Sequence, residues 1–316
     1  MCQTCDNIFC GDTLRGESPA LREITKLVDT VAQSDCAVLI EGETGTGKEL
    51  VARRLHAASP RRDKPFVPVN CAGLTESLFE SQFFGHVRGA FTGAEEAMLG
   101  MVRTADGGTL FVDEISEIAP NLQAKFLRVL QEREVTPVGL PTPVRVDTRF
   151  IAATNRNLLE EVRQDRFRRD LFYRLNVVRI HIPPLRDRPE DIPVLLEFFV
   201  ARYAERHHRP AVAVSTPVRR QLTAHPWPGN VRELMNWVER LYVTGLPPEA
   251  LATSLLAENE EAPLERPSGV MSLAQAEEWA IRRAMDAADN SQQGAADLLR
   301  IHRSTLSRKL KQYAMA

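Results

Sequence analysis

The segment "AVLIEGETGTGKELVARRLHAAS", residues 37–59, constrains the fold more than any other stretch of this chain. Its first residues, 37–41, form a short apolar run, which is typical of a strand buried on both faces. A glycine-rich loop follows at once, and residues 48–59 predict a helix. Strand, glycine loop and helix in this order present backbone N–H groups at a helix N-terminus to a phosphate. The segment therefore indicates an α/β fold with a phosphate site beside the sheet.

The loop departs from the usual phosphate-binding pattern at one position. Gly42, Gly47 and Lys48 match G-x-x-x-x-G-K-[S/T], but Glu49 stands where a hydroxyl normally reaches Mg²⁺. A decayed site and a chance match to an ordinary glycine turn are the alternatives, and the loop alone leaves them open. The residues expected to contact a nucleotide are Gly42, Glu43, Thr44, Gly45, Thr46, Gly47, Lys48 and Glu49.

The pattern of apolar runs repeats beyond this segment. Strands are predicted at 66–70, 108–115, 148–155 and 177–182, and helices at 18–33, 74–85 and 121–134. Strands that alternate with helices imply a parallel sheet flanked by helices. We therefore expect a parallel sheet of the P-loop class.

Polar side chains follow two of these strands where each one ends. Asp113 and Glu114 come after "TLFV", where one carboxylate can hold Mg²⁺ and the other can polarise water. Thr154 and Asn155 end "IAATN" and can orient the attacking water, although turn chemistry at a strand end explains them equally well. The phosphate loop upstream favours the catalytic interpretation of the two acids.

Several longer motifs together resemble one family. "GETGTGKE", "ESQFFGHVRGAFTGA", "GGTLFVDEI", "FRRDLFYRLNVV", "PPLRDR" and "HPWPGNVREL" are similar to bacterial enhancer-binding proteins, the AAA+ activators of sigma-54 RNA polymerase. The resemblance covers roughly residues 10–245. In that family a glutamate commonly follows the loop lysine, which implies that Glu49 is the family's own version and that the site is intact. The resemblance implies an ATPase that uses ATP and Mg²⁺.

The resemblance also implies a role for each site residue. Lys48 would bind phosphate, Asp113 would hold the metal and Glu114 would activate water. Asn70 would be the switch asparagine that pairs with the catalytic glutamate, and Thr154 and Asn155 would be the first sensor. Arg168 and Arg174 would be the arginine fingers donated to the adjacent subunit. Arg232 would be the second sensor in the lid.

The hexapeptide "GAFTGA", residues 89–94, is an unusual loop sequence. It places a large apolar side chain between glycines, and glycine hinges that hold an aromatic tip suit a contact that forms and withdraws. An exposed Phe on a glycine-rich loop also needs no special explanation. In the resembled family this loop contacts sigma-54. Its residues are Gly89, Ala90, Phe91, Thr92, Gly93 and Ala94.

The C-terminal residues predict a compact helical domain. Three helices with helix-turn-helix spacing resemble the Fis-type domain of the same activators, with Ala295, Leu298, Leu306 and Leu310 expected in its core. The last helix is basic and hydroxyl-rich, which suits phosphates and base edges of a major groove. The alternative is a basic solvated helix. The candidate DNA contacts are Arg303, Ser304, Thr305, Ser307, Arg308 and Lys309.

Changes in patterning divide the chain into five expected segments. They are a short leader (1–10), the AAA+ α/β subdomain (11–182), an AAA+ helical lid subdomain (183–245), a proline-containing linker (246–270) and an all-α helix-turn-helix domain (271–316). The fold class is thus α/β with a helical lid, plus a C-terminal all-α domain.

The leader and the composition bear on control and location. Cys2, Cys5 and Cys10 have metal-like spacing but offer three thiolates without an obvious fourth ligand, so a frayed terminus is the plainer interpretation. About ten residues precede the match, so we expect no attached receiver or sensor domain, and control by a trans-acting regulatory protein, by expression level or by the leader. A membrane-spanning helix needs an apolar run of about 18 residues, and every apolar run in this sequence is much shorter. The sequence also has no secretory signal. We expect a cytoplasmic protein.

The expected partners follow from the resemblance. They are the sigma-54 RNA polymerase holoenzyme, double-stranded DNA upstream of the promoter, and further copies of this chain in a dimer-to-hexamer series. Two other functions stay open at this point: a DNA-binding repressor that uses ATP as an assembly switch, and a general AAA+ remodeller. The acidic residue Glu114 argues against the first, and the loop at 89–94 argues against the second.

Overall fold

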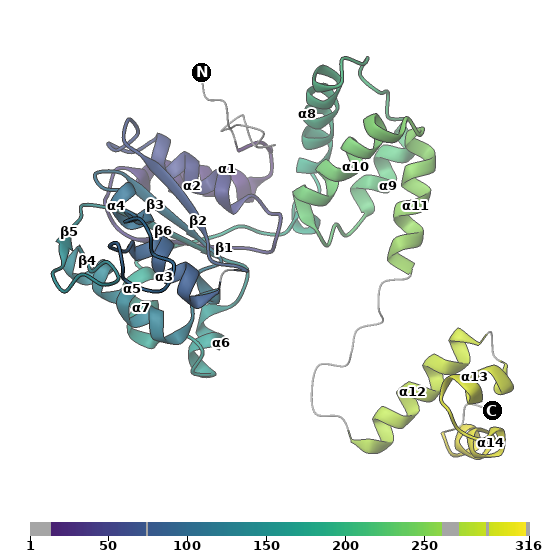
Figure 1. The fold of residues 1–316 in the computed structure, drawn as a ribbon. Coiled ribbons are helices and arrows are strands. Elements are labelled where there is room, and N and C mark those ends of the chain that lie inside the picture. The colour runs from purple at the N-terminus through teal and green to yellow at the C-terminus, as the bar shows by residue number, and fades with distance from the viewer. Residues whose placement is uncertain (1–13, 74, 261–271, 289–290, 314–316) are drawn as a thin grey trace. The chain divides into compact units, whose positions relative to one another are not determined.

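The computed structural model describes residues 14–73, 75–260, 272–288 and 291–313. The chain divides into two compact units, Met1–Leu256 and Ala257–Ala316 (Figure 1). The expected leader, with Cys2, Cys5 and Cys10, lies outside the described residues.

The first unit is built on a five-stranded parallel sheet. Its strand order is β2-β3-β6-β1-β7, so the strand before the phosphate loop lies between two neighbours. The strands are β1 (Val38–Glu41), β2 (Phe66–Asn70), β3 (Thr109–Asp113), β6 (Arg149–Thr154) and β7 (Val178–His181). The apolar runs of β1, β3 and β6 are almost wholly buried, because helices cover both faces of a parallel sheet.

Helices connect the strands and cover the sheet. They are α1 (Pro19–Ala32), α2 (Lys48–Ala57), α3 (Glu76–Phe84), α4 (Met101–Thr104), α5 (Pro120–Glu132), α6 (Leu158–Arg163) and α7 (Arg169–Leu175). A short antiparallel hairpin, β4 (Glu134–Val135) with β5 (Val144–Arg145), was not expected from the sequence.

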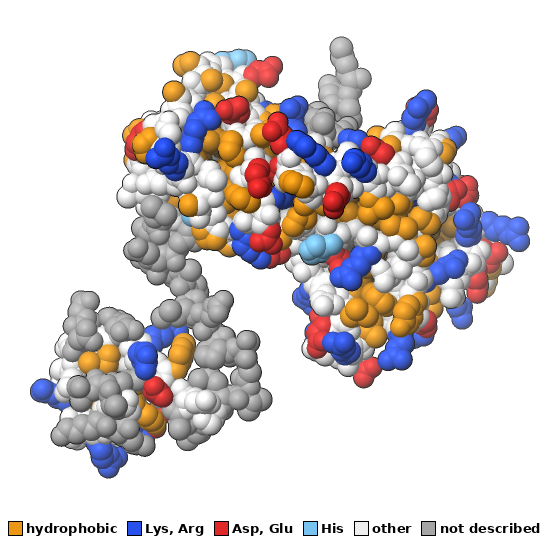
Figure 2. Space-filling model, turned by 180° about the vertical axis from the view of Figure 1, so that it is seen from behind, with side chains coloured by type: hydrophobic (Ala, Val, Ile, Leu, Met, Phe, Trp, Pro, Cys, Tyr) orange, Lys and Arg blue, Asp and Glu red, His pale blue; other side chains and the backbone are white. Residues whose placement is uncertain are grey.

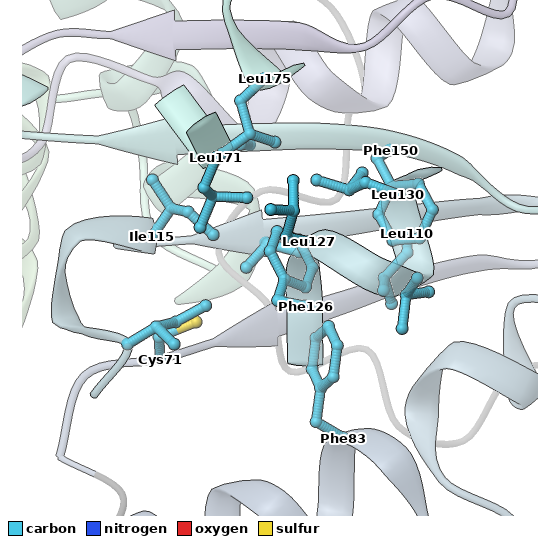
Figure 3. Close-up of a cluster of buried hydrophobic side chains, with 14 of the residues drawn as sticks. Cys71, Phe83, Leu110, Ile115, Phe126, Leu127, Leu130, Phe150, Leu171 and Leu175 are labelled. Atoms are coloured by element: carbon cyan, nitrogen blue, oxygen red, sulfur yellow. The ribbon is translucent and has the colours of Figure 1, made fainter. Parts of the chain in front are cut away.

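Alternation along β3 separates two apolar cores. Phe111 packs with α1 and α2 on one face of the sheet. Leu110 packs on the other face, where Phe126 of α5 and Leu171 of α7 join it (Figure 3). Successive side chains of a strand point to opposite faces, so one strand stabilises both layers. The rigid sheet then fixes where the strand-end polar residues lie.

A helical lid follows the sheet, and the part of it up to Leu256 belongs to the same unit. It contains α8 (Asp191–Arg206), α9 (Thr216–Ala224), α10 (Asn230–Thr244) and α11 (Pro248–Glu260). Its core includes the fully buried Trp227 and Trp237.

The expectation of a linker at 246–270 is wrong for residues 248–260, which form α11. Leu251, Ala252 and Leu255 of this helix are buried in the lid core. The prolines misled the prediction because Pro248 stands at the first position of α11, where a missing N–H costs nothing.

The second unit contains α12 (Leu273–Ala287), α13 (Gln292–Leu298) and α14 (Arg303–Gln312). Ala295, Leu306 and Leu310 lie in its core as expected, but Leu298 is 60% exposed. Leu299 packs against the core instead, because it lies one helical turn after Ala295 on the same face.

Acidic and basic side chains are interspersed over the face of the molecule seen from behind (Figure 2). This mixture accords with the formal net charge of −2. Within the described chain, none of the helices has the length and apolar character needed to cross a membrane.

Candidate functional site

The phosphate loop lies between the end of β1 and the start of α2. Gly47 caps α2 with a left-handed backbone (φ 103°), which glycine adopts without a steric cost. The buried Lys48 donates to the Gly42 carbonyl at 2.9 Å and lies 3.7 Å from a carboxylate oxygen of Glu114. An open cavity of about 770 Å³ adjoins the loop. Its lining includes Thr44, Lys48, Glu49, Asn70, Asp113, Glu114 and Arg232, so the structure brings these residues together.

Asp113 and Glu114 lie at the end of β3, facing the loop. Burial, and the nearby charge of Glu114, raise the pKa of Asp113 above its usual range. Glu114 has a left-handed backbone (φ 52°), which is uncommon for a residue with a side chain. The two acids create a concentration of negative charge that suits a divalent cation. Carboxylate oxygens of this kind are ligands that fit Mg²⁺.

The end of β6 contacts both neighbouring parts of the site. The Asn155 backbone N–H donates to a Glu114 carboxylate oxygen at 3.2 Å, and its carboxamide donates to the Thr44 hydroxyl at 3.1 Å. Thr154 is fully buried, and its hydroxyl donates to the Ser116 hydroxyl at 3.2 Å. Asn155 therefore links the end of β3 to the phosphate loop, whereas Thr154 contacts Ser116 after β3.

Asn70 and Glu49 have other contacts in this structure. The Asn70 carboxamide oxygen accepts the Ala72 N–H at 2.8 Å, while Glu114 contacts Lys48 and Asn155. Glu49 accepts from Arg53, one turn along α2, at 2.7 Å. Both side chains line the phosphate cavity, so a bound ligand would meet them.

A second cavity of about 630 Å³ borders the other side of the loop. Sequence reasoning missed it, because its walls come from α8, α10 and the segment before α1. The apolar part of its lining is Leu14, Leu50, Leu195, Phe198, Phe199, Val231 and Met235. Gly45, Gly47, Leu50 and Arg232 line both cavities, so the two cavities adjoin each other at the loop.

Lid side chains also hold the rim of the loop, which the motifs did not indicate. The Glu43 carboxylate accepts two bonds from Arg186, at 2.9 and 2.6 Å, and one from Asn230 at 3.1 Å. Arg186 is the main reason that the pKa of Glu43 lies below its usual range. Glu43 was expected to contact nucleotide, but its side chain engages the lid. The two arginines of "PPLRDR", Arg186 and Arg188, were the only sequence feature that could have indicated a contact between this motif and the loop.

Arg168, the N-cap residue of α7, and Arg174, within α7, lie outside the residues that line the phosphate cavity of their own chain. Arg168 forms a two-bond ion pair with Asp170, at 3.0 and 2.7 Å. Arg174 donates to the Leu130 carbonyl at 3.3 Å. Tyr173, between them in the helix, is 66% exposed. The structure therefore leaves both arginines apart from the site that their own chain builds.

The loop at 89–94 is closed by its own backbone. The Gly89 N–H donates to the Ala94 carbonyl at 2.9 Å, and the Ala94 N–H to the Phe91 carbonyl at 3.0 Å. Phe91 is 46% exposed and its ring lies 5.0 Å from that of His86. Ala94 is buried and Thr92 is exposed, so the tip presents Phe91 and Thr92.

The basic helix α14 begins at Arg303. Arg303, Ser304 and Arg308 are exposed, while Thr305 and Ser307 are half-buried. The Lys309 ammonium forms an ion pair with Glu277 of α12 at 2.6 Å, which holds two helices of the domain together. Arg303 and Arg308 are therefore freer than Lys309 to meet a ligand outside the domain.

Comparison with known families covers nearly the whole described chain. The sigma-54 interaction domain matches residues 14–181, the AAA+ ATPase lid domain matches 186–267, and the Fis family of bacterial regulatory proteins matches 272–313.

Individual relatives agree with these matches. The transcriptional regulatory protein ZraR of Klebsiella oxytoca is 49% identical over 307 residues, which cover 93% of this chain and 68% of the relative. The DNA-binding transcriptional regulator NtrC of Rhizobium meliloti is 41% identical over 344 residues, covering 97% of this chain and 70% of the relative.

A solved structure is also similar. The crystal structure of NtrX from Brucella abortus in complex with ATP has a TM-score of 0.72 and 33% identity, covering 95% of this chain and 69% of that one. The family matches decide between the activator and the two alternative functions. The chain belongs to the sigma-54-dependent transcription activators, AAA+ ATPases with a nucleotide-binding domain and a Fis-type DNA-binding domain.

Proposed function

We propose that the chain uses ATP hydrolysis to convert the closed complex of sigma-54 RNA polymerase into an open complex. The observation that carries this proposal is the meeting of Lys48, Asp113 and Glu114 around one cavity, in a chain whose loop at 89–94 presents an exposed aromatic tip. The cavity supplies the chemistry, and the tip supplies the contact that transmits it.

Each residue has a distinct part in hydrolysis. Backbone N–H groups of residues 45–47 bind phosphate, and Lys48 exchanges its carbonyl partners for phosphate oxygens. Asp113 would hold Mg²⁺, which when bound neutralises charge on the phosphates. Glu114 orients and deprotonates the attacking water. Asn155 holds Glu114 in place through its N–H.

The remaining site residues act around this centre. Asn70 exchanges its bond with Ala72 for one with Glu114 and thereby reports the phosphate state, and Arg232 of the lid reaches the phosphates from α10. The apolar cavity beside the loop takes the adenine base. Its lining is largely apolar, and it shares Gly45 with the phosphate cavity.

The site is completed by a second copy of the chain. Arg168 caps α7 and Arg174 lies within it; both are exposed and lie outside their own cavity, so they can reach the phosphates of a neighbour. A closed ring, a hexamer assembled from dimers, gives every subunit one such neighbour. An arginine supplied in this way stabilises transition-state charge only after assembly.

The proposed contacts with sigma-54 and with DNA lie on different units of the chain. The tip formed by Phe91 and Thr92 contacts sigma-54. Helix α14 enters the major groove of upstream DNA through the exposed Arg303 and Arg308, with Ser304, Thr305, Ser307 and Lys309 as further candidates. A protein that works on RNA polymerase and promoter DNA acts in the cytoplasm, where a trans-acting regulatory protein can reach it.

Comparison of two variants tests the proposal. Thr92→Ala should leave ATP binding near normal and hydrolysis within a few-fold, yet abolish sigma-54 capture with a transition-state mimic and abolish open-complex formation. Lys48→Ala should lose nucleotide binding and everything after it, because phosphate affinity depends on charge preorganised in the site. Thr30→Ala, at an exposed threonine of α1, is the matched control. If Thr92→Ala opened promoters at the wild-type rate, the loop at 89–94 would not be the element that transmits ATP hydrolysis to sigma-54.

A further inference from the structure

The carbonyl groups of the phosphate loop are held by lid side chains. The Asn230 carboxamide donates to the Thr44 carbonyl at 3.0 Å, and Arg188 donates to the Thr46 carbonyl at 3.1 Å. Both donors are buried, so water does not compete with these bonds. The lid therefore bonds to carbonyl oxygens of the loop.

These contacts determine which way the loop N–H groups point. In a trans peptide the C=O of one residue and the N–H of the next are coplanar and point in opposite directions. Holding the Thr44 carbonyl toward the lid turns the Gly45 N–H away from it, and holding the Thr46 carbonyl does the same for Gly47. Both glycines have positive φ (81° and 103°). Because glycine has no side chain to restrict its backbone, outside contacts decide the orientation.

Asn230 is placed to make this contact in only one way. It is fully buried and has a left-handed backbone (φ 54°), which asparagine tolerates. Its carboxamide oxygen accepts the Leu185 N–H at 2.7 Å, and its nitrogen faces the Thr44 carbonyl and Glu43. A flipped amide would bring oxygen against two acceptors, so the orientation is fixed.

The Glu43–Arg186 pair completes the contact. Both side chains are about half exposed, and ion pairs of that kind contribute little to folding stability. The pair instead fixes the position of the Glu43 carboxylate, which accepts a hydrogen bond from the Asn230 carboxamide. One end of the pair belongs to the loop and the other to the start of the lid, so the pair is sensitive to any movement between them.

We propose that Asn230 is a positioning residue through which the lid sets the peptide orientation of the phosphate loop, and that the Glu43–Arg186 pair keeps it engaged. The inference rests on the nucleotide binding of the family and goes beyond the residues that touch nucleotide. Lid displacement would release the Thr44 carbonyl and weaken the hold on phosphate without changing any phosphate ligand. Nucleotide affinity is thereby coupled to lid position, which suits a site that must release ADP in each cycle.

Asn230→Gly gives the direct test, since glycine keeps the left-handed backbone and removes the carboxamide with its bonds to Thr44, Glu43 and Leu185. We expect the ratio of ADP affinity to adenosine affinity, measured by calorimetry on the full chain, to fall at least tenfold. Adenosine lacks phosphates, so a general loss of structure would weaken both ligands alike. Equal weakening of ADP and adenosine would overturn the proposal, as would no change in either.

Asn230→Asp adds a second expectation. The carboxylate has no proton to donate and meets the like charge of Glu43, so ADP binding should fall further than in Asn230→Gly. ADP binding by Asn230→Asp equal to wild type would contradict the assigned donor role.

A double-mutant cycle tests the supporting pair without touching a buried residue. Glu43→Gln and Arg186→Met should each lower the ADP-to-adenosine affinity ratio, and the double variant should lose no more than the worse single one. The control pair is Glu197 and Arg219, which bond at 2.8 Å on the lid surface away from the loop. Glu197→Gln and Arg219→Met should leave the ratio unchanged. Equal effects of the two pairs, or strict additivity at Glu43 and Arg186, would refute the coupling.

Discussion

Removal of the buried charge at Asp191 should destabilise the lid strongly. Asp191 is fully buried and Arg188 is 3% exposed, with 3.5 Å between their charged atoms. Asp191 also accepts the N–H groups of Glu17 and Ser18 and the Ser18 hydroxyl, at 2.7, 2.8 and 2.8 Å. It therefore ties the start of α1, the lid and, through Arg188, the phosphate loop.

The size of the effect follows from what Asp191→Asn leaves behind. Burial already lowers the pKa of Arg188, and Asp191 opposes that shift, so the guanidinium depends on this partner. Breaking a buried ion pair from one side costs about 3–5 kcal/mol, because the other charge stays buried and uncompensated. Losing the Ser18 cap by Ser18→Ala should cost only about 1 kcal/mol. Against a total stability of about 5–15 kcal/mol, Asp191→Asn is a large change.

Urea unfolding followed by tryptophan fluorescence measures this cost. Trp227 and Trp237 are buried in the lid core, so they report its unfolding. A Trp279→Phe background removes the tryptophan of the second unit from the signal. Glu197→Gln, which breaks an exposed pair, is the control and should cost no more than about 1 kcal/mol. If Asp191→Asn costs as little as that control, the buried pair does not stabilise the lid and the reasoning fails.

Three other expectations concern the site, the assembly and DNA. Since burial and Glu114 raise the pKa of Asp113, Asp113→Asn should raise the Tm of the nucleotide-free chain at pH 7, by about 2–4 °C for each kcal/mol of stability gained. This gain in Tm should shrink as the pH falls through the raised pKa, because the carboxyl group of Asp113 in the wild-type chain is then already protonated. Calorimetry at a series of pH values measures both effects. Mixing Glu114→Gln subunits with Arg168→Ala subunits should restore some ATP turnover at mixed interfaces, and no recovery at any ratio of co-assembling variants would argue against shared sites. Arg303→Ala or Arg308→Ala should weaken binding to upstream DNA by about 1–3 kcal/mol in fluorescence anisotropy if they contact bases, with unchanged affinity as the contrary result.

The sequence was sufficient for the parts of the site that lie within one local pattern. The apolar run of β1, its glycine loop and α2 form a continuous segment, and the acids of β3 follow their strand directly. Parallel strands bring their carboxyl ends to one edge of the sheet, so the strand prediction placed these groups at the same edge. It did not give the strand order, in which β6 lies between β1 and β3.

The contacts between the lid and the loop could not be predicted in this way. Glu43 and Arg186 are 143 residues apart, and Thr44 and Asn230 are separated by 186. Their meeting depends on how the lid packs, which no local periodicity encodes. The apolar cavity beside Gly45 has the same origin, since its walls come from separate helices. Helix α11 was missed for a different reason: a proline that begins a helix resembles a proline that ends one.

The left-handed backbone of Glu114 has a consequence for laboratory evolution. A residue with a β-carbon pays about 1–2 kcal/mol for that conformation, and glycine does not. Exchange of this glutamate for glycine would relax the backbone and simultaneously remove the group that we propose to activate water. A library screened for heat resistance alone should therefore enrich inactive chains at this position. Selection for thermal stability favours glycine at this position, whereas selection for ATP turnover favours glutamate. A thermostable and active variant must therefore be selected for both properties at once.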